Sequence, residues 1–214
     1  MPLPIKKAVA HLRAVDPVLA EVIERVGPCR ARLSAERTHF GAVMRAIVYQ
    51  QLSGKAAATI HGRVLALFGD REPTPRELLR LDDTTLRGAG LSRAKTVYVK
   101  DLATRALARG FAMERLHERD DSSVIEALTS VKGVGLWTAQ MFLMFRLGRP
   151  DVLPGLDLGI RKGVQRAYRM RRLPTPAQVE KRGVAWAPYR TIASWYLWRL
   201  LDLPATSAAT EGEA

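Results

Sequence analysis

Residues 123–147 read SVIEALTSVKGVGLWTAQMFLMFRL. Two stretches of helical pattern, Ser123–Thr129 and Leu136–Leu147, flank a short turn that holds two glycines. Gly133 and Gly135 permit a positive φ, and they let the backbone approach a ligand without a Cβ in the way. The sequence therefore predicts a hairpin of two helices whose turn can lie directly against a bound group.

The start of the second helix predicts an anion site. The free N–H groups of a first helical turn, and successive N–H groups in a turn, bind phosphate without needing a side-chain charge. Such contacts position a protein on DNA but do not read its sequence. The expected phosphate-binding residues are Lys132, Gly133, Val134, Gly135, Thr138 and Arg161, with Arg93, Lys95 and Lys162 as further candidates.

Charge and cysteine content narrow the class of protein. Thirty-four Lys and Arg against 21 Asp and Glu give a net charge of +13, which attracts polyanions, although ribosomal and other basic proteins share this balance. Cys29 is the single cysteine, which excludes an intrachain disulfide and an iron–sulfur cluster held by four thiolates. We expect a monomer in a reducing cytoplasm, associated with the nucleoid if the cell is bacterial.

Membrane insertion and export are not expected. No apolar run approaches the roughly 18 residues that span a bilayer. The N-terminal stretch MPLPIKK, residues 1–7, is basic and has no apolar core of the kind found in a signal peptide.

The fold class is predicted to be all-α. Apolar residues recur at helical spacing almost everywhere, and alternating strand patterns bounded by hairpin turns are missing. The expected helices are Pro17–Val26, Phe40–Gln51, Lys55–Phe68, Pro75–Leu81, Ala94–Ala108, Ser123–Thr129, Leu136–Leu147, Asp157–Tyr168, Pro176–Arg182 and Pro188–Leu201.

The helices are expected to form two lobes with a cleft between them. Residues 1–37 would supply N-terminal helices that pack with the C-terminal lobe, and residues 38–154 would form a central lobe that includes the hairpin at 123–147. Residues 155–203 would form the C-terminal lobe. Residues 204–214 lack large apolar side chains and are expected to be a disordered tail.

One internal echo of the hairpin is present. LRGAGL at residues 86–91 resembles VKGVGL at residues 131–136, and each is followed by an alanine at the same spacing. Both stretches predict a helix, a glycine turn and a second helix. A glycine at a helix C-terminus is common in any helical bundle, so the first copy alone indicates no function.

Four segments together resemble one family. LTSVKGVGLWTA at residues 128–139 and LPGLDLGIR at 153–161 are similar to the helix-hairpin-helix/Gly-Pro-Asp DNA glycosylase superfamily, and most similar within it to the 3-methyladenine DNA glycosylase II family. AIVYQQLSGKAA at 46–57 and WAPYRT at 186–191 agree, so the resemblance covers roughly residues 38–201. The mixed α/β N-terminal domain of some members has no counterpart in these residues, so we expect a short form of the family.

The resemblance implies an enzyme of base excision repair. It would flip alkylated bases such as 3-methyladenine and 7-methylguanine out of duplex DNA and hydrolyse the glycosidic bond, leaving an abasic site. Members that also cleave the strand use a lysine in the helix after the hairpin. This chain has Trp137 and Thr138 there, so the resemblance implies a monofunctional glycosylase without lyase activity.

Asp157 is the implied catalytic carboxylate. It would stabilise the oxocarbenium character of the sugar and orient or deprotonate a water. Glycoside hydrolases usually need a second acid for the leaving group, but a purine alkylated at N3 or N7 already carries positive charge and leaves unaided. From position alone Asp157 could equally cap the following helix, since Asp is a preferred N-cap residue. Asp151 is the nearest competing carboxylate and is expected in a loop.

The resemblance also implies a wedge and a base pocket. Gln51 or Leu52 would fill the gap left by the flipped base, unless Gln51 caps a helix and Leu52 packs in the core. Trp137, Met141 and Trp198 would line the pocket, where an aromatic face attracts a cationic base. Trp and Met at helical spacing are more often core residues.

No cofactor is expected to be required. The resemblance implies a monovalent cation, Na⁺ or K⁺, held by the main-chain carbonyls of Thr129, Val131 and Val134. Three other functions stay open: a non-catalytic DNA-binding protein, a glycosylase or glycosylase/lyase for another lesion, and an RNA-binding protein. The last lacks any visible RNA-binding motif or aromatic sheet platform.

Overall fold

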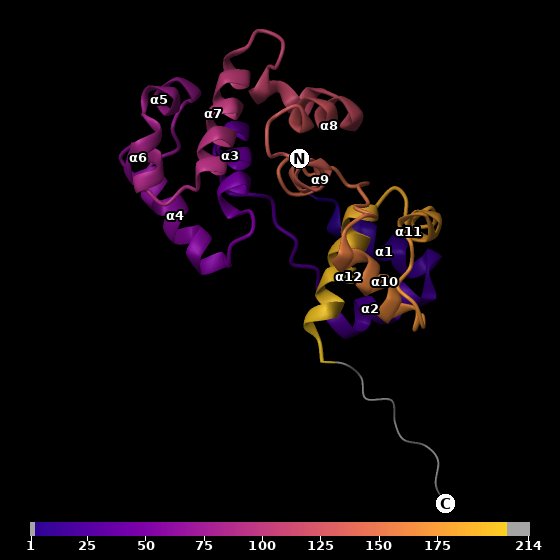
Figure 1. Cartoon of the computed structure of the whole chain (residues 1–214). Coiled ribbons are helices and arrows are strands. Elements are labelled where there is room, and N and C mark those ends of the chain that lie inside the picture. Colours follow the sequence, from indigo (N-terminus) through magenta and orange to yellow (C-terminus); the bar gives the residue numbers. More distant parts are fainter. Residues whose placement is uncertain (1–2, 205–214) are drawn as a thin grey trace, which may run out of the picture. The chain divides into compact units, whose positions relative to one another are not determined.

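The computed structural model describes residues 3–204, and every regular element within them is helical (Figure 1). The all-α fold class is therefore confirmed. In chain order the elements are α1 (Ile5–Val15), α2 (Pro17–Val26), α3 (His39–Tyr49), α4 (Gly54–Ala66), α5 (Pro75–Arg80), α6 (Asp83–Gly88), α7 (Arg93–Leu107), the 3₁₀ helix η1 (Met113–Glu118), α8 (Asp121–Thr129), α9 (Leu136–Phe145), α10 (Leu158–Ala167), α11 (Pro176–Gly183) and α12 (Arg190–Asp202).

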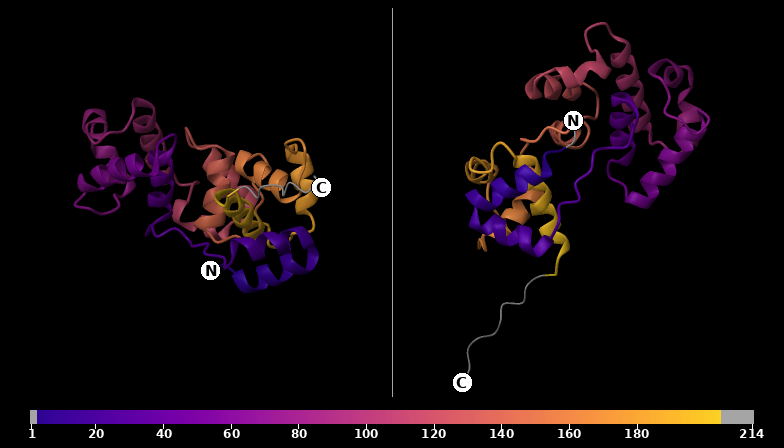
Figure 2. Two further views of the ribbon diagram at one scale, coloured as in Figure 1. Left: turned by 90° about the horizontal axis from the view of Figure 1, so that it is seen from below. Right: turned by 180° about the vertical axis from the view of Figure 1, so that it is seen from behind.

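The chain divides into two compact units. The central unit comprises Arg32–Gly148, and the terminal unit comprises residues 3–31 together with residues 149–204. In the terminal unit α1 and α2 pack against α12, and α2 also contacts α10, as expected for the N-terminal helices (Figure 2). Of the predicted tail, residues 205–214 lie outside the described residues.

The first boundary lies earlier than the predicted one after residue 37. Residues 32–37 belong to the central unit because hydrogen bonds attach them to the end of α9. The Ser34 N–H donates to the Phe145 carbonyl at 2.7 Å. The Arg146 guanidinium donates to the carbonyls of Glu36 and Arg37 at 2.5 and 3.1 Å.

The second boundary likewise lies before residue 154. Residues 149–151 are bound to the start of α12, because the Thr191 N–H donates to the Pro150 carbonyl at 3.0 Å and its hydroxyl donates to the Arg149 carbonyl at 2.6 Å. Asp151 accepts two hydrogen bonds from the Arg190 guanidinium, at 2.7 and 2.8 Å. These contacts assign the segment to the terminal unit.

α3 is the central helix of the first unit. Its apolar face is buried and packs against α4, α7, α9 and η1. Thr38 caps its N-terminus through Gly41 N–H, and Glu72 accepts from the N–H and hydroxyl of Thr38 at 3.0 and 2.7 Å. These caps fix where α3 begins, and the helix then delivers the turn at residues 50–53 to its other end.

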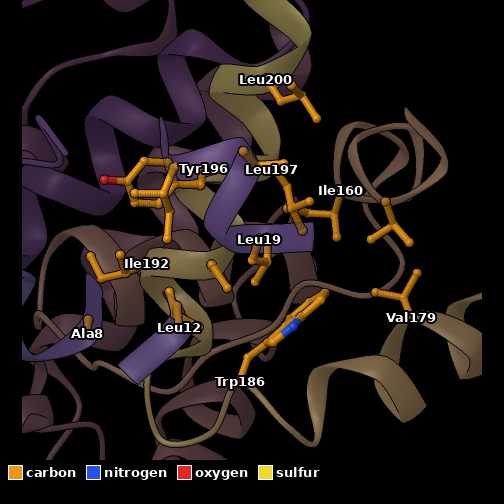
Figure 3. Packing of buried hydrophobic residues seen from close by; sticks show 14 residues of the cluster. Ala8, Leu12, Leu19, Ile160, Val179, Trp186, Ile192, Tyr196, Leu197 and Leu200 are labelled. Carbon is orange, nitrogen blue, oxygen red and sulfur yellow. The ribbon is translucent and has the colours of Figure 1, made fainter. Parts of the chain in front are cut away.

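The terminal unit has a hydrophobic core that includes the fully buried Trp186 (Figure 3). Asp16 connects its parts: Oδ1 accepts from the N–H groups of Val18 and Leu19, and Oδ2 accepts from Trp186 Nε1 at 2.8 Å. The Tyr168 hydroxyl also donates to Oδ2. One carboxylate therefore caps α2 and joins it to the end of α10 and to the segment before α12.

Two glycines bring α10 and α12 together. A Cβ on Gly163 would lie 2.7 Å from the Leu197 carbonyl oxygen, and a Cβ on Gly159 would lie 2.9 Å from both Asp157 Oδ1 and the Trp198 ring. Residues four apart lie on one face of a helix, so this face of α10 has no side chains to hold α12 away. The close approach places Trp198 beside the N-terminus of α10.

Candidate active site

Asp157 is the N-cap residue of α10. Its Oδ1 accepts from the Ile160 N–H at 2.8 Å and from Trp198 Nε1 at 2.9 Å. The capping role that its position predicted is thus present in the structure. Capping uses Oδ1 and does not exclude a second role for the carboxylate, because a carboxylate can accept about four hydrogen bonds.

The surroundings of Asp157 leave it accessible from solvent. The side chain is half-buried, and the leucines on either side of it, Leu156 and Leu158, are 65% and 51% exposed. Negative charge at this position is stabilised by the two N–H donors and by the helix N-terminus.

Asp151 is arranged differently. Each of its oxygens accepts from Arg190, and the Arg190 backbone N–H donates to Oδ1 at 3.3 Å. Although burial acts to raise the pKa of Asp151, the hydrogen bonds and charge of Arg190 hold that pKa below its ordinary value. Asp151 lies in a loop, as expected, and its partners give it a structural role at the start of α12.

The predicted hairpin is formed by α8, α9 and the turn between them. Gly133 has φ +76°, and a Cβ there would lie 2.2 Å from the Tyr98 ring, so only glycine fits. Lys132, Gly133 and Gly135 are exposed, and the N-cap of α9 is Gly135, which offers no capping side chain. The positive end of the α9 dipole is therefore presented at an exposed turn.

Two basic residues among the expected phosphate contacts have hydrogen-bond partners within the chain, which rule out a phosphate contact for Lys95 and leave one for Arg161 a prediction. Lys95 points inward, and its ammonium donates to the carbonyls of Val48 and Gln50 at 2.7 Å each, while burial lowers its pKa. The expectation of a phosphate contact for Lys95 is wrong, because its charge satisfies the C-terminal carbonyls of α3 instead. Arg161 is half-buried and donates through Nε to the Pro174 carbonyl at 2.8 Å.

The two wedge candidates lie in the turn between α3 and α4. Gln51 is exposed with φ +55°, and Leu52 is 39% exposed. Gln51 was expected otherwise to cap a helix, but the C-cap of α3 is Gln50. Leu52 was expected otherwise to pack in the core, but its side chain is exposed. A wedge role for either residue stays a prediction.

A cavity of about 210 Å³ lies in the central unit. Met141 and Thr138 from α9 line it, together with Arg45 from α3 and Glu36. Glu36 Oε1 lies 3.1 Å from Arg45 Nε. Burial acts to raise the pKa of Glu36, but the hydrogen bond from the Ser34 hydroxyl and the charge of Arg45 outweigh burial and lower that pKa. The cavity wall thus carries one ionised carboxylate together with two arginines, Arg45 and Arg146.

The two tryptophans of the predicted base pocket have different environments. Trp137 is 52% exposed on the first turn of α9 and is not part of the cavity lining, whereas Trp198 is half-buried against Asp157. Trp198 therefore has a contact that the pattern did not predict, with the carboxylate itself. The sequence does not show that α10 and α12 pack together, so it could not predict that Trp198 of α12 lies beside Asp157.

The predicted cation ligands flank the hairpin turn. Thr129 is the last residue of α8, and the Val131 carbonyl accepts from the Val134 N–H at 3.1 Å. A carbonyl oxygen has a second lone pair, so this bond leaves the prediction of a monovalent cation open. Within residues 3–204 no group of three His, Cys, Asp or Glu side chains is placed to hold a metal, and no helix there is long and apolar enough to cross a membrane.

Known proteins resemble this chain in sequence and in structure. DNA-3-methyladenine glycosylase 1 of Schizosaccharomyces pombe is 35% identical over 202 residues, covering 93% of this chain and 89% of that protein. DNA-3-methyladenine glycosylase 2 of Escherichia coli is 28% identical over 166 residues, covering 72% and 55%. The 3-methyladenine DNA glycosylase of S. pombe solved with abasic DNA superimposes with a TM-score of 0.82 at 34% identity, covering 94% of this chain and 99% of that one.

A family match agrees with these relatives. The family described as "HhH-GPD superfamily base excision DNA repair protein" matches residues 44–188, which include both the hairpin and Asp157. The resemblance seen in the sequence motifs is thereby confirmed. The chain belongs to the HhH-GPD superfamily of base excision DNA repair proteins, among relatives named as DNA-3-methyladenine glycosylases.

Proposed function

We propose that this chain is a monofunctional DNA glycosylase that excises alkylated purines from duplex DNA by hydrolysis. The observation that carries the proposal is Asp157, held at the N-terminus of α10 by the Ile160 N–H and the Trp198 indole in a chain of this superfamily. It would act on cellular DNA in the cytoplasm, at the nucleoid if the cell is bacterial.

The proposed chemistry needs one carboxylate. As the bond between C1′ and the base nitrogen breaks, its electron pair leaves with the cationic base, which departs as a neutral methylpurine. Positive charge then develops on the sugar, and the Asp157 carboxylate stabilises it. A water adds to C1′ and loses its proton, for which Asp157 is the candidate base. No acid is required for a base that is already charged.

DNA would be held by the hairpin. The turn at residues 132–135 exposes Lys132, Gly133 and Gly135, and with the uncapped N-terminus of α9 it can bind backbone phosphates, to which Lys132 adds charge. The S. pombe relative was solved with abasic DNA, which supports this assignment. Gln51 or Leu52 would fill the space left by the flipped nucleotide, since both are exposed in one turn.

A cationic base would find two favourable features. Trp137 is 52% exposed on α9, and Trp198 is half-buried beside Asp157, so each offers an aromatic face that attracts a cation. The absence of a lysine at Trp137 or Thr138 favours hydrolysis without strand cleavage.

The test is release of free base from randomly methylated duplex DNA, followed by a check for strand breaks. Wild type should release methylpurines and leave unbroken abasic DNA, while Asp157→Asn should lose release and retain DNA binding. Asp202→Asn is the matched control, because Asp202 lies in the same unit and only pairs with Arg199 at the surface.

Three outcomes would contradict the proposal. Equal activity of the Asp157→Asn variant would place the catalytic carboxylate elsewhere. Strand breaks, with borohydride trapping of the protein on DNA, would indicate a lyase. DNA binding by a wild type that releases no base would favour a non-catalytic DNA-binding protein.

A further inference from the structure

One face of α7 contacts two turns. They are the turn at residues 50–53, which we call the wedge turn, and the turn at residues 132–135, which we call the hairpin turn. Lys95, Tyr98 and Asp101 are spaced three residues apart and share this face, which we call the α7 face. All three are half-buried. All of the contacts described below lie within the central unit.

Lys95 holds the end of α3. Its ammonium donates to the carbonyls of Val48 and Gln50, both at 2.7 Å, at the point where α3 ends and the wedge turn begins. Carbonyls in a last helical turn have no partner within the helix, and a cation there is also favoured by the helix dipole. Gln51, the next residue, adopts φ +55°, an unfavourable conformation that its neighbours must hold in place.

Tyr98 and Asp101 hold the hairpin turn. The Tyr98 ring lies against Gly133, where a Cβ would meet it at 2.2 Å. Asp101 Oδ2 accepts from the Lys132 N–H at 2.9 Å and from Arg105 Nε at 2.9 Å. The turn proposed to bind phosphate is thus attached to the same helix as the wedge turn.

A direct bond joins the two turns. Gln50 Nε2 donates to the Gly133 carbonyl at 2.8 Å. Gln50 therefore belongs to both sets of contacts: its carbonyl binds Lys95 and its amide binds the hairpin. Lys95, Gln50, Gly133 and Tyr98 close a ring of contacts between α7, the wedge turn and the hairpin.

We propose that Lys95 is a positioning residue that fixes the wedge turn relative to the hairpin turn, so that a duplex bound through its phosphates meets the wedge at a set depth. The inference rests on the proposed function. Opening a base pair costs a few kcal/mol, and only a wedge held in place offsets that cost. Losing the Lys95 contacts should therefore impair excision of a paired base far more than excision of an unpaired one.

The test compares Lys95→Met with wild type in single-turnover excision of one 7-methylguanine. The lesion is placed opposite cytosine in one duplex and opposite a tetrahydrofuran abasic-site analogue in the other. We expect an at least tenfold loss opposite cytosine, which corresponds to about 1.4 kcal/mol, and a loss of less than about threefold opposite the analogue. Binding to undamaged duplex should be unchanged, because the hairpin phosphate contacts remain.

Control variants separate positioning from folding. Lys100 lies on α7 like Lys95, but it pairs with Asp83 at the surface. Lys100→Met should therefore leave the excision rates in both duplexes unchanged. Gln50→Leu removes the bond to Gly133 and should reproduce the dependence on pairing, which also provides the test if Lys95→Met does not fold. Equal losses in both duplexes, or no loss in either, would overturn the inference. Failure of wild type to excise from either duplex would instead contradict the proposed function.

Discussion

At the scale of single residues, the position of Asp157 depends on another helix. Its carboxylate oxygen is held by an N–H of its own helix and by the indole N–H of Trp198, which α12 supplies. A side chain fixed from two directions loses little freedom when it acts, so in the proposed reaction its charge would already be in place where positive charge develops.

Trp198→Phe tests this dependence. The substitution keeps an aromatic ring but removes the N–H donor, so Asp157 should become less ordered. We expect single-turnover excision of 7-methylguanine to slow by about tenfold, the loss of one charge-assisted hydrogen bond, with a small change in thermal stability. Trp195→Phe is the control, because Trp195 lies on α12 and packs edge-on against Tyr196. Unchanged excision by Trp198→Phe would show that the hydrogen bond from Trp198 is not needed to orient Asp157.

The sequence did not predict the contacts of the site residues. Its motif marked Asp157 as the candidate catalytic residue, a role that stays a prediction, and the capping role that followed from the helix after it is confirmed. Lys95 was misassigned because a basic residue at a helix start is compatible with both a surface phosphate and an internal carbonyl. Only the packing of α7 against α3 decides between them. The Gln50 bond to Gly133 joins residues 83 positions apart and has no signal in the local sequence.

At the scale of elements, the ends of a helix were predicted where the local sequence carries a capping or terminating residue. Both ends of α2 were predicted, because Asp16 caps it before Pro17 and Gly27 ends it. α1 was not delimited, since its N-cap is Pro4 and no side chain marks its start. α6 and η1 were not among the helices expected from periodicity, because six residues are too few for a 3.6-residue periodicity to emerge. α5 is equally short, but Pro75 at its first position and the capping box of Thr74 and Glu77 mark where it begins.

Gly163→Ala tests the close contact between α10 and α12. The added Cβ would meet the Leu197 carbonyl at 2.7 Å, and a backbone atom cannot rotate away. We expect a loss of about 1–3 kcal/mol in the free energy of unfolding, measured by urea denaturation. Gly62→Ala in α4 is the matched control: nothing lies within 4 Å of its Cβ, and it should stabilise the protein by about 0.5–1 kcal/mol. Similar stability of both variants would mean that the helices can move apart freely.

At the scale of the whole molecule, the net charge of +13 makes affinity for DNA dependent on salt. Lys132→Met should weaken binding to duplexes of any sequence alike, because a phosphate contact carries no sequence information. A plot of log affinity against log salt concentration should become shallower by about 0.9, the contribution of one phosphate contact. Lys7→Met in α1 is a charge-matched control. An unchanged slope for Lys132→Met would remove Lys132 from the DNA contacts.

The terminal unit combines the first and the last parts of the chain: α1 and α2 bury their apolar faces against α10 and α12, and Asp16 binds Trp186 across 170 positions of sequence. This arrangement has a consequence for biosynthesis. As the chain leaves the ribosome, α1 and α2 emerge before the helices they pack against, whereas the central unit is complete once residue 148 has emerged. α1 and α2 therefore reach their native packing only after α10 and α12 have been made, and until then the leucines and valines that they bury stay exposed to water.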